Sequence, residues 1–214
     1  MSRVTRIARR ASGSSLAVLA FLGVAACGGG GDATIDTAGA PGVETAPAPP
    51  AAGAGESAAA AGATLNDAQI AHVAVTANAI DSAAGVMAQE KGQSQEVKDF
   101  AKTMVTDHAG VNKQAVALAT RLNVTPEDND VSRQLNAGAD QAADSLRALS
   151  GAAFDRAYIA REVGFHQAVL DALDKTLIPG AQNGELKKLL QDVRPAIAAH
   201  LDRARSIQGS LGGQ

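Results

Sequence analysis

The sequence has little of what many folds and functions need: one cysteine, no tryptophan, one tyrosine and four phenylalanines in 214 residues. A single cysteine excludes an intrachain disulfide, so a folded domain must be held together by packing alone. Strict alternation of apolar and polar residues is missing and β-branched residues are sparse, which argues against strands. Without the four arginines of residues 1–26, 15 basic residues stand against 22 acidic ones, a net charge of −7. An acidic chain poor in aromatic side chains lacks the basic surface and stacking platforms that nucleic acids require, so no nucleic-acid partner is expected.

Residues 1–26 have the pattern of a secretory signal peptide. Four arginines and no acidic residue precede an apolar run at residues 16–26, which is shorter than the roughly 20 residues of a membrane-spanning helix. Cys27 directly follows two alanines, which resembles a bacterial lipobox, and the resemblance implies that Cys27 is lipidated and becomes the mature N-terminus. The alternative is a buried or free thiol. Gly28 after the cysteine resembles lipoproteins sorted to the outer membrane, so we expect an exported protein of the outer membrane or periplasm, attached to the membrane by this lipid.

The rest of the chain divides by composition. Residues 27–63 are mostly glycine, alanine and proline. They offer almost no large apolar side chain to bury, so a disordered tether is expected between the lipid and the folded domain. Residues 64–209 carry regular apolar stripes and are expected to form the domain. Residues 210–214 are expected to be a disordered tail.

Four segments of the domain show apolar residues at alternating steps of three and four, which is the spacing of one helix face. The predicted helices are residues 64–91, 94–123, 152–177 and 183–208. A variant capping box at Thr64 and Asp67 is expected to begin the first, and Asn183 is expected to cap the last. The connection at residues 123–151 is long and partly helical. We therefore predict an all-α, ferritin-like antiparallel four-helix bundle with a long, partly helical crossover, and the alternative is an up-down-up-down bundle with an extra helix.

Three of the four histidines fall inside these apolar stripes, one on each of three predicted helices. His108 stands in the stripe of the second helix, and His200 in that of the fourth. Glu162 and His166 are four residues apart in the stripe of the third. Buried imidazoles and carboxylates need hydrogen-bonding partners or a metal ion, so these positions predict a site.

The number of residues between a side chain and the nearest tight turn gives its height along the bundle axis, at about 1.5 Å per residue. On that scale His108, His166, His200 and Glu162 fall near one level, together with Asp81 at the edge of the first helix's stripe. His72 projects well away from that stripe and is predicted to lie at the surface. Asp107 points about 100° away from the direction of its neighbour His108.

Two interpretations of this layer stay open. In the first, His108, His166, His200, Glu162 and Asp81 hold one transition-metal ion, such as zinc, iron, manganese or copper. In the second, the layer is only hydrogen-bonded, with the Tyr158 hydroxyl contributing, and it fixes the register of the helices. A di-iron oxidase is not expected, because that site needs two Glu-x-x-His pairs and the chain has none.

The motifs also resemble a known family. They are EVKDFAKTMVTDH at residues 96–108, FDRAY at residues 154–158 followed by His166, and Pro195 five residues before His200-Leu201. In this order and spacing they resemble the bacterial envelope proteins grouped as domain of unknown function 4142. The resemblance covers residues 65–207 and implies a ferritin-like helical fold and an exported, often membrane-associated protein. It implies no activity and no protein partner. Asp81 stands where many members carry glutamate.

Overall fold

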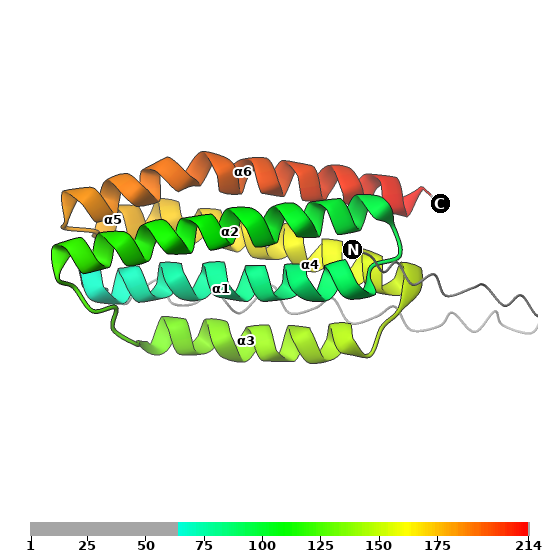
Figure 1. The fold of residues 1–214 in the computed structure, drawn as a ribbon, viewed down its shortest axis with the longest axis horizontal. Coiled ribbons are helices and arrows are strands. Elements are labelled where there is room, and N and C mark those ends of the chain that lie inside the picture. The colour runs from blue at the N-terminus through cyan, green and yellow to red at the C-terminus, as the bar shows by residue number, and fades with distance from the viewer. Residues whose placement is uncertain (1–63, 214) are drawn as a thin grey trace, which may run out of the picture. The chain divides into compact units, whose positions relative to one another are not determined.

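A computed structural model describes residues 64–213, and these residues form helices with no strand among them. The long helices are α1 (Asp67–Lys91), α2 (Gln95–Leu122), α3 (Asp130–Arg147), α4 (Gly151–Ala172) and α6 (Gly184–Gly212), shown in Figure 1. The prediction of an all-α fold is confirmed for these residues. The predicted signal peptide (1–26), the lipidated Cys27, the tether (27–63) and Gln214 lie outside the described residues.

Hydrogen bonds at the two ends of the bundle define the direction of each helix. At one end, Asp155 near the start of α4 accepts from the backbone N–H groups of Gln93 and Ser94, at 2.9 and 2.7 Å, in the α1–α2 turn. At the other end, Asp67 at the start of α1 accepts two backbone N–H groups, at 2.8 Å each, from the loop before α6. Consequently α1 and α6 run in one direction, and α2 and α4 run in the opposite direction.

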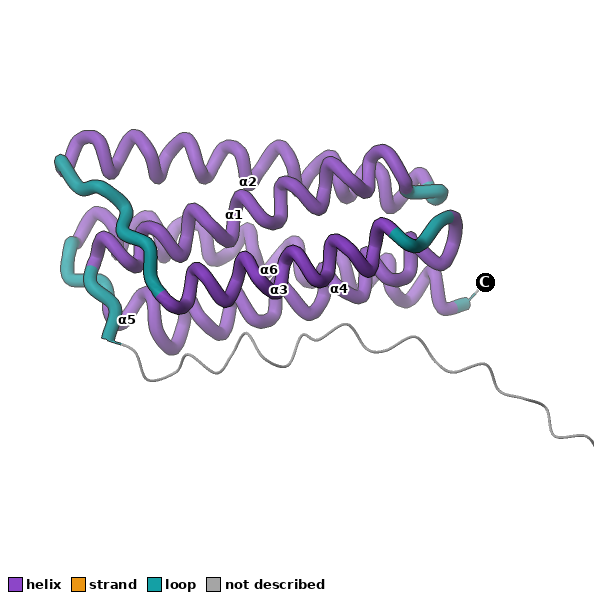
Figure 2. The backbone as a smooth tube through the Cα atoms, turned by 90° about the horizontal axis from the view of Figure 1, so that it is seen from below, coloured by secondary structure: helices purple, strands orange, loops and turns teal. Residues whose placement is uncertain are grey.

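Helix α3 is the crossover between the two antiparallel hairpins. Just before α3 begins, the Glu127 N–H donates to the carbonyl of Ala68 near the start of α1. Where α3 ends, Lys91 at the end of α1 donates to the carbonyl of Leu146. The crossover therefore runs beside α1 along its whole length, and Figure 2 shows it on the outside of the bundle. The helix α3 thus connects the α1–α2 hairpin to the α4–α6 hairpin, and successive long helices alternate in direction along the chain.

The bundle has two apolar cores, one toward each end. The first contains leucines and isoleucines around Ile70, Leu118, Leu173 and Leu190. The second contains Met104, Ile207 and the aromatic residues Phe100, Phe154 and Tyr158. Along α1, α2 and α4, the histidine or carboxylate positions of the predicted layer fall between the residues of these two cores. On α6, His200 lies next to Leu201 of the first core and one turn before Ala204 of the second.

Several helix ends differ from the predicted ones. The predicted capping box at Thr64 and Asp67 is wrong: Asn66 caps α1, and its side chain and that of Gln69 accept each other's backbone N–H groups. Asn183 caps α6 as predicted, accepting two backbone N–H groups. The prediction that residues 210–214 form a disordered tail is wrong for residues 210–212, because α6 continues to Gly212.

The end of α4 is also irregular. A π-helical turn, Leu173–Leu177, follows α4, and the short α5 (Ile178–Gly180) follows that turn. The Ile178 N–H donates to the carbonyl of Leu173, five residues back. The next residue, Pro179, has no N–H to continue the regular ladder, so the wider turn lies where the helix is ending.

Helix α1 is long and apolar enough to cross a membrane, judged by length and composition alone. In the structure it packs against α2, α3 and α4 and carries the fully buried Asp81. Its apolar character is accounted for by its position as the helix with neighbours on three sides.

Candidate functional site

Five polar side chains from four helices meet in the interior of the bundle. All five are buried, with exposed fractions between 0 and 7%: Asp81 on α1, His108 on α2, Glu162 and His166 on α4, and His200 on α6. The centroids of the three imidazole rings are 5.4 to 5.8 Å apart. One ring nitrogen from each lies within 4.8 Å of the other two. The sequence-predicted layer is therefore formed, and its histidines face one another.

Asn78, one turn before Asp81 on α1, orients the ring of His108. The Asn78 amide nitrogen donates to the carbonyl of Ala74 at 2.8 Å, which leaves the amide oxygen facing His108. His108 Nδ1 lies 2.7 Å from that oxygen and therefore donates to it. His108 Nε2, on the other side of the ring, lies 2.8 Å from Asp81 Oδ2. Neither of these two atoms has an aligned hydrogen-bond partner.

The other two imidazoles follow the same pattern. His166 Nδ1 donates to the backbone carbonyl of Glu162 at 3.0 Å, because a carbonyl can only accept. His200 Nε2 lies 3.0 Å from a carboxylate oxygen of Asp107 on α2 and donates to it. The remaining nitrogens, His166 Nε2 and His200 Nδ1, are buried and have no hydrogen-bond partner. Burial lowers the pKa of His166 to about 4 and also lowers the pKa of His200, so both rings are neutral at pH 7.

Arg161 connects the two buried carboxyl groups. Its Nη1 donates to Asp81 Oδ1 at 2.8 Å and to Glu162 Oε1, while its guanidinium stacks over the ring of Phe165 at 4.5 Å. Arg161 leaves Asp81 Oδ2 free, and that oxygen also lies 3.7 Å from His166 Nε2. Burial disfavours the charge on Asp81, but the contact with His108 and the charge of Arg161 outweigh it and hold the Asp81 pKa below its usual range.

The pKa of Glu162 is shifted in the opposite direction from that of Asp81. Burial and the neighbouring charge of Asp81 raise the pKa of Glu162 well above its usual range, and Arg161 compensates only in part. Glu162 therefore keeps its proton to a higher pH than an exposed glutamate. Its Oε2 lies 3.5 Å from His166 Nδ1 and has no aligned hydrogen-bond partner.

Three residues of the site were not predicted from the sequence: Asn78, Arg161 and Asp107. Asp107 does point away from His108, as predicted, but in that direction it meets His200 of another helix. His72 was predicted to lie at the surface and is half-buried, with its Nδ1 buried and unpartnered. The Tyr158 hydroxyl, proposed as a member of a hydrogen-bonded layer, has no hydrogen-bond partner.

Comparisons with known proteins give one match. Residues 52–207 match the family model described as a domain of unknown function (DUF4142). No curated protein and no solved structure matches the chain. The likeness to ferritin-like proteins therefore stays a prediction, and the arrangement of side chains has to carry the functional argument.

Proposed function

The chain belongs to the DUF4142 family, as its motifs predicted, and we propose that its bundle binds one transition-metal ion through His108, His166, His200 and Asp81. Glu162 is an additional candidate ligand of this site. It would have to release its proton first, because ligands bind metals in their deprotonated forms.

A single observation carries the proposal: four buried nitrogen and oxygen atoms of this cluster have no aligned hydrogen-bond partner. They are His108 Nε2, His166 Nε2, His200 Nδ1 and Asp81 Oδ2. His108 Nε2 and Asp81 Oδ2 lie only 2.8 Å apart, a separation that either a proton or a metal ion between the two atoms stabilises. The three imidazoles form one group with ligand atoms within 4.8 Å of one another, and Asp81, Glu162 and His166 form a second, so a metal ion could bind either group, with His166 belonging to both.

The surroundings of the imidazoles support the same conclusion. Ligand histidines commonly donate their second N–H to an amide, a carbonyl or a carboxylate, which orients the ring and fixes its tautomer. Asn78, the Glu162 carbonyl and Asp107 provide these three acceptors. Three imidazoles and one carboxylate suit zinc, iron, manganese or copper. The reaction chemistry of such an ion does not follow from the ligands alone.

The route to the site runs between α2 and α6. A surface hollow there is lined by His200, Asp107, Asp99 and Arg203, among others. Asp107 is 46% exposed at its side chain, whereas that of His200 is only 9% exposed. An arriving cation would therefore meet the carboxylate of Asp107 before it reaches the imidazoles.

The test uses the full chain, stripped with a chelator and then titrated separately with Zn²⁺, Mn²⁺, Fe²⁺ and Cu²⁺. Calorimetry and elemental analysis are expected to give one ion per chain with at least one metal. His108→Gln and His166→Gln are each expected to weaken binding by more than about 100-fold, since loss of a supporting group alone costs 10- to 100-fold. His72→Gln makes the same change at a histidine outside the cluster and should bind normally.

The alternative is that the layer serves packing only, and the ion pairs of Arg161 with both carboxylates favour it. It predicts no stoichiometric binding of any of the four metals and no metal-dependent rise in Tm. In that case the histidine substitutions would change stability alone. That pattern would remove the metal proposal.

We also propose that the protein is exported and anchored by a lipid on Cys27. The support is the sequence of residues 1–28: a basic start, a short apolar run and a cysteine after two alanines. Cys27→Ala is expected to block cleavage by the lipoprotein peptidase and to leave the longer precursor, visible by mass spectrometry. Normal processing of Cys27→Ala would contradict the proposal.

A further inference from the structure

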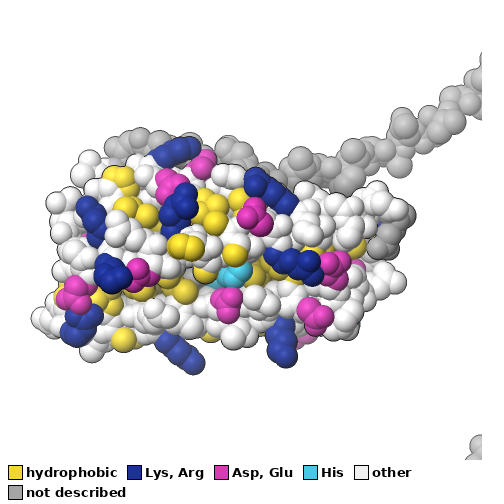
Figure 3. All heavy atoms as spheres, turned by 90° about the horizontal axis from the view of Figure 1, so that it is seen from above, with side chains coloured by type: hydrophobic (Ala, Val, Ile, Leu, Met, Phe, Trp, Pro, Cys, Tyr) yellow, Lys and Arg dark blue, Asp and Glu magenta, His cyan; other side chains and the backbone are white. Residues whose placement is uncertain are grey.

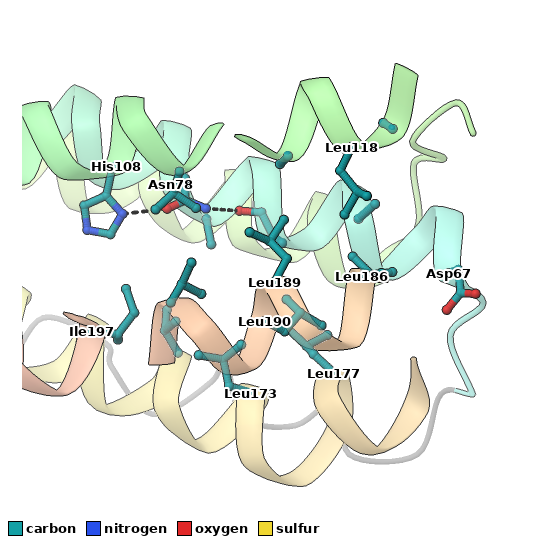
Figure 4. Close-up of a pocket in the computed structure, with 18 of the residues that line it drawn as sticks. Asp67, Asn78, His108, Leu118, Leu173, Leu177, Leu186, Leu189, Leu190 and Ile197 are labelled. Carbon is teal, nitrogen blue, oxygen red and sulfur yellow. Dashed lines mark hydrogen bonds between the residues drawn. The ribbon is translucent and has the colours of Figure 1, made fainter. Parts of the chain in front are cut away.

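A cavity of about 110 Å³ lies beside the metal-binding layer, in the half of the bundle that contains the α4–α6 turn. Side chains from α1, α2, α4, the π-helical turn and α6 line it. Figure 4 shows leucine and isoleucine side chains directed into the space, with His108 and Asn78 at one end and Asp67 at the other. Natural protein interiors hold few voids larger than a water molecule, so a space of this size requires an explanation.

The cavity exists because two helices contribute small side chains to its wall. Helix α1 contributes Ala71, Ala74 and Ala77, and α2 contributes Ala115 and Ala119. Larger apolar residues at these positions would fill the space. On the opposite wall, Leu173 and Leu177 come from the two ends of the π-helical turn.

The polar groups at the two ends of the cavity are already hydrogen-bonded elsewhere. The Asn78 side chain is occupied by His108 and the carbonyl of Ala74. Asp67 accepts two backbone N–H groups. The free nitrogens of His108 and His166 lie 2.8 and 3.7 Å from Asp81 Oδ2, on the side of the metal-binding layer. The interior therefore offers an occupant apolar contact and little hydrogen bonding.

We propose that this cavity binds a small, uncharged, apolar molecule, no larger than a single six-membered ring or a short alkyl chain. The size follows from the volume, because an apolar cavity of about 150 Å³ in another protein stays dry and binds benzene or xenon. This inference does not rest on the metal proposal. It assigns the bundle a second ligand class at a separate place.

The seam between α2 and α6 gives such a molecule a way in. Val111 and Ala115 of α2 and Leu189 and Val193 of α6 line the cavity and are only half-buried. Figure 3 shows hydrophobic side chains exposed on this face next to one histidine, with charged side chains scattered around them. A ligand can therefore enter through side-chain movements, without separation of the helices.

The test uses the full chain in excess chelator, so that no metal contributes. Saturating benzene is expected to raise Tm by a few degrees, because a ligand that binds only the folded state stabilises it. Hexanoate, which has a similar apolar length but carries a charge, is expected to leave Tm unchanged. A His200→Gln variant, altered in the metal-binding layer but not in the cavity wall, should lose metal binding and keep the benzene shift.

Ala115→Leu places a larger side chain in the cavity wall and is expected to weaken benzene binding by at least about tenfold, the effect of extra methylene groups in a closed pocket. Ala117→Leu makes the same change on the exposed face of α2 and should keep the shift. Should Ala115→Leu fail to fold by circular dichroism, Ala74→Val gives the same comparison from α1. The inference is overturned by the absence of a benzene shift in the unaltered protein, or by equal shifts in the cavity and surface variants.

Discussion

At the scale of single residues, the charge state of Glu162 is decided by competition for Arg161. One guanidinium donates to two buried carboxyl groups, and it can neutralise only one of them. Asp81 also contacts His108, so its pKa is lowered, whereas burial and the charge of Asp81 raise the pKa of Glu162.

This assignment makes stability depend on pH in a definite direction. In the unfolded chain Glu162 ionises near pH 4.3, whereas in the folded chain it keeps its proton well above that pH, because burial and Asp81 raise its pKa. Above about pH 4.5 the folded state therefore binds more protons than the unfolded state at this residue. The contribution of Glu162 to the free energy of unfolding falls as pH rises, by up to about 1.4 kcal/mol per pH unit.

Glu162→Gln is expected to remove this loss, because glutamine resembles the neutral acid and does not titrate. Relative to the unaltered protein, the variant should gain at least about 1 kcal/mol of unfolding free energy between pH 5 and pH 8. Urea unfolding in chelator at pH 5, 6.5 and 8 measures this difference. Asp81, Arg161, His166 and His200 face the same site in both proteins, so most of their contribution cancels. Parallel stability curves would show that Glu162 titrates normally.

The residues that sequence reasoning found share one property. His108, His166 and His200 interrupt apolar stripes, so their burial could be predicted from their own helices. Asn78, Arg161 and Asp107 do not interrupt a stripe in a recognisable way. Their functions depend on which side chain of another helix lies opposite, and one helix's spacing carries no such information. The central place of Asp81, at the edge of its stripe, was underestimated for the same reason.

At the scale of elements, Gly85 sets how closely α1 and α2 approach, one turn beyond Asp81. A Cβ atom at Gly85 would lie 2.9 Å from the Ala101 carbonyl oxygen of α2 and 3.0 Å from a methyl group of Val105. The carbonyl is backbone and can move only with its helix. Glycine at this position lets the two helices pack more closely than an alanine would.

Gly85→Ala and Gly110→Ala form a matched pair, because both change a glycine inside a helix. A Cβ atom at Gly110 would meet no neighbouring group within 4 Å, so alanine there should add up to about 1 kcal/mol through helix propensity. At Gly85 the steric overlap should outweigh that gain, since overpacking typically costs about 1–3 kcal/mol. Denaturant unfolding is expected to find Gly110→Ala more stable than Gly85→Ala by roughly 2 kcal/mol. Equal stabilities would mean that α1 and α2 separate without cost.

The helices themselves were largely predictable, and their irregular ends were not. Apolar spacing located every long helix, and Asn183 was recognisable as a cap from the residues around it. Asn66 was missed because Thr64 offered a similar capping pattern two residues earlier. The π-helical turn at Leu173–Leu177 left no pattern in the stripe of α4. Its formation depends on the balance between hydrogen bonding along the helix backbone and the packing of its side chains against other helices.

At the scale of the whole bundle, the buried polar layer and the cavity both reduce stability. At about 24 cal/mol per Å³, an empty space of 110 Å³ costs about 2–3 kcal/mol. Domains of this size have only about 5–15 kcal/mol in total. Substitution of the wall alanines by larger residues would recover part of that energy. Within the described residues, the cavity adjoins the only cluster of buried histidines. Ligand binding would account for the presence of both of these destabilising features.

The crossover helix α3 is the least anchored part of the described bundle. Of its 18 residues only Ser132 and Leu146 are buried, and its main packing partner is α1 alone. By contrast, α4 buries seven residues, including Glu162 and His166. Regions with few buried contacts open locally at a lower free energy than the whole domain. The four helices that build the site can therefore remain packed while α3 separates from α1.

Hydrogen exchange measured by mass spectrometry should show this difference directly. Amides of residues 133–145 are expected to exchange by local opening, at rates that respond weakly to low denaturant. Amides of residues 156–168 in α4 should exchange only on global unfolding, with the steep denaturant dependence that this implies. A Leu146→Ala variant should speed exchange in α3 and leave α4 unchanged, because Leu146 contacts the core only at the end of the crossover. If both segments instead exchange together at all denaturant concentrations, α3 is an integral part of the cooperative unit, and the site cannot be attributed to four helices alone.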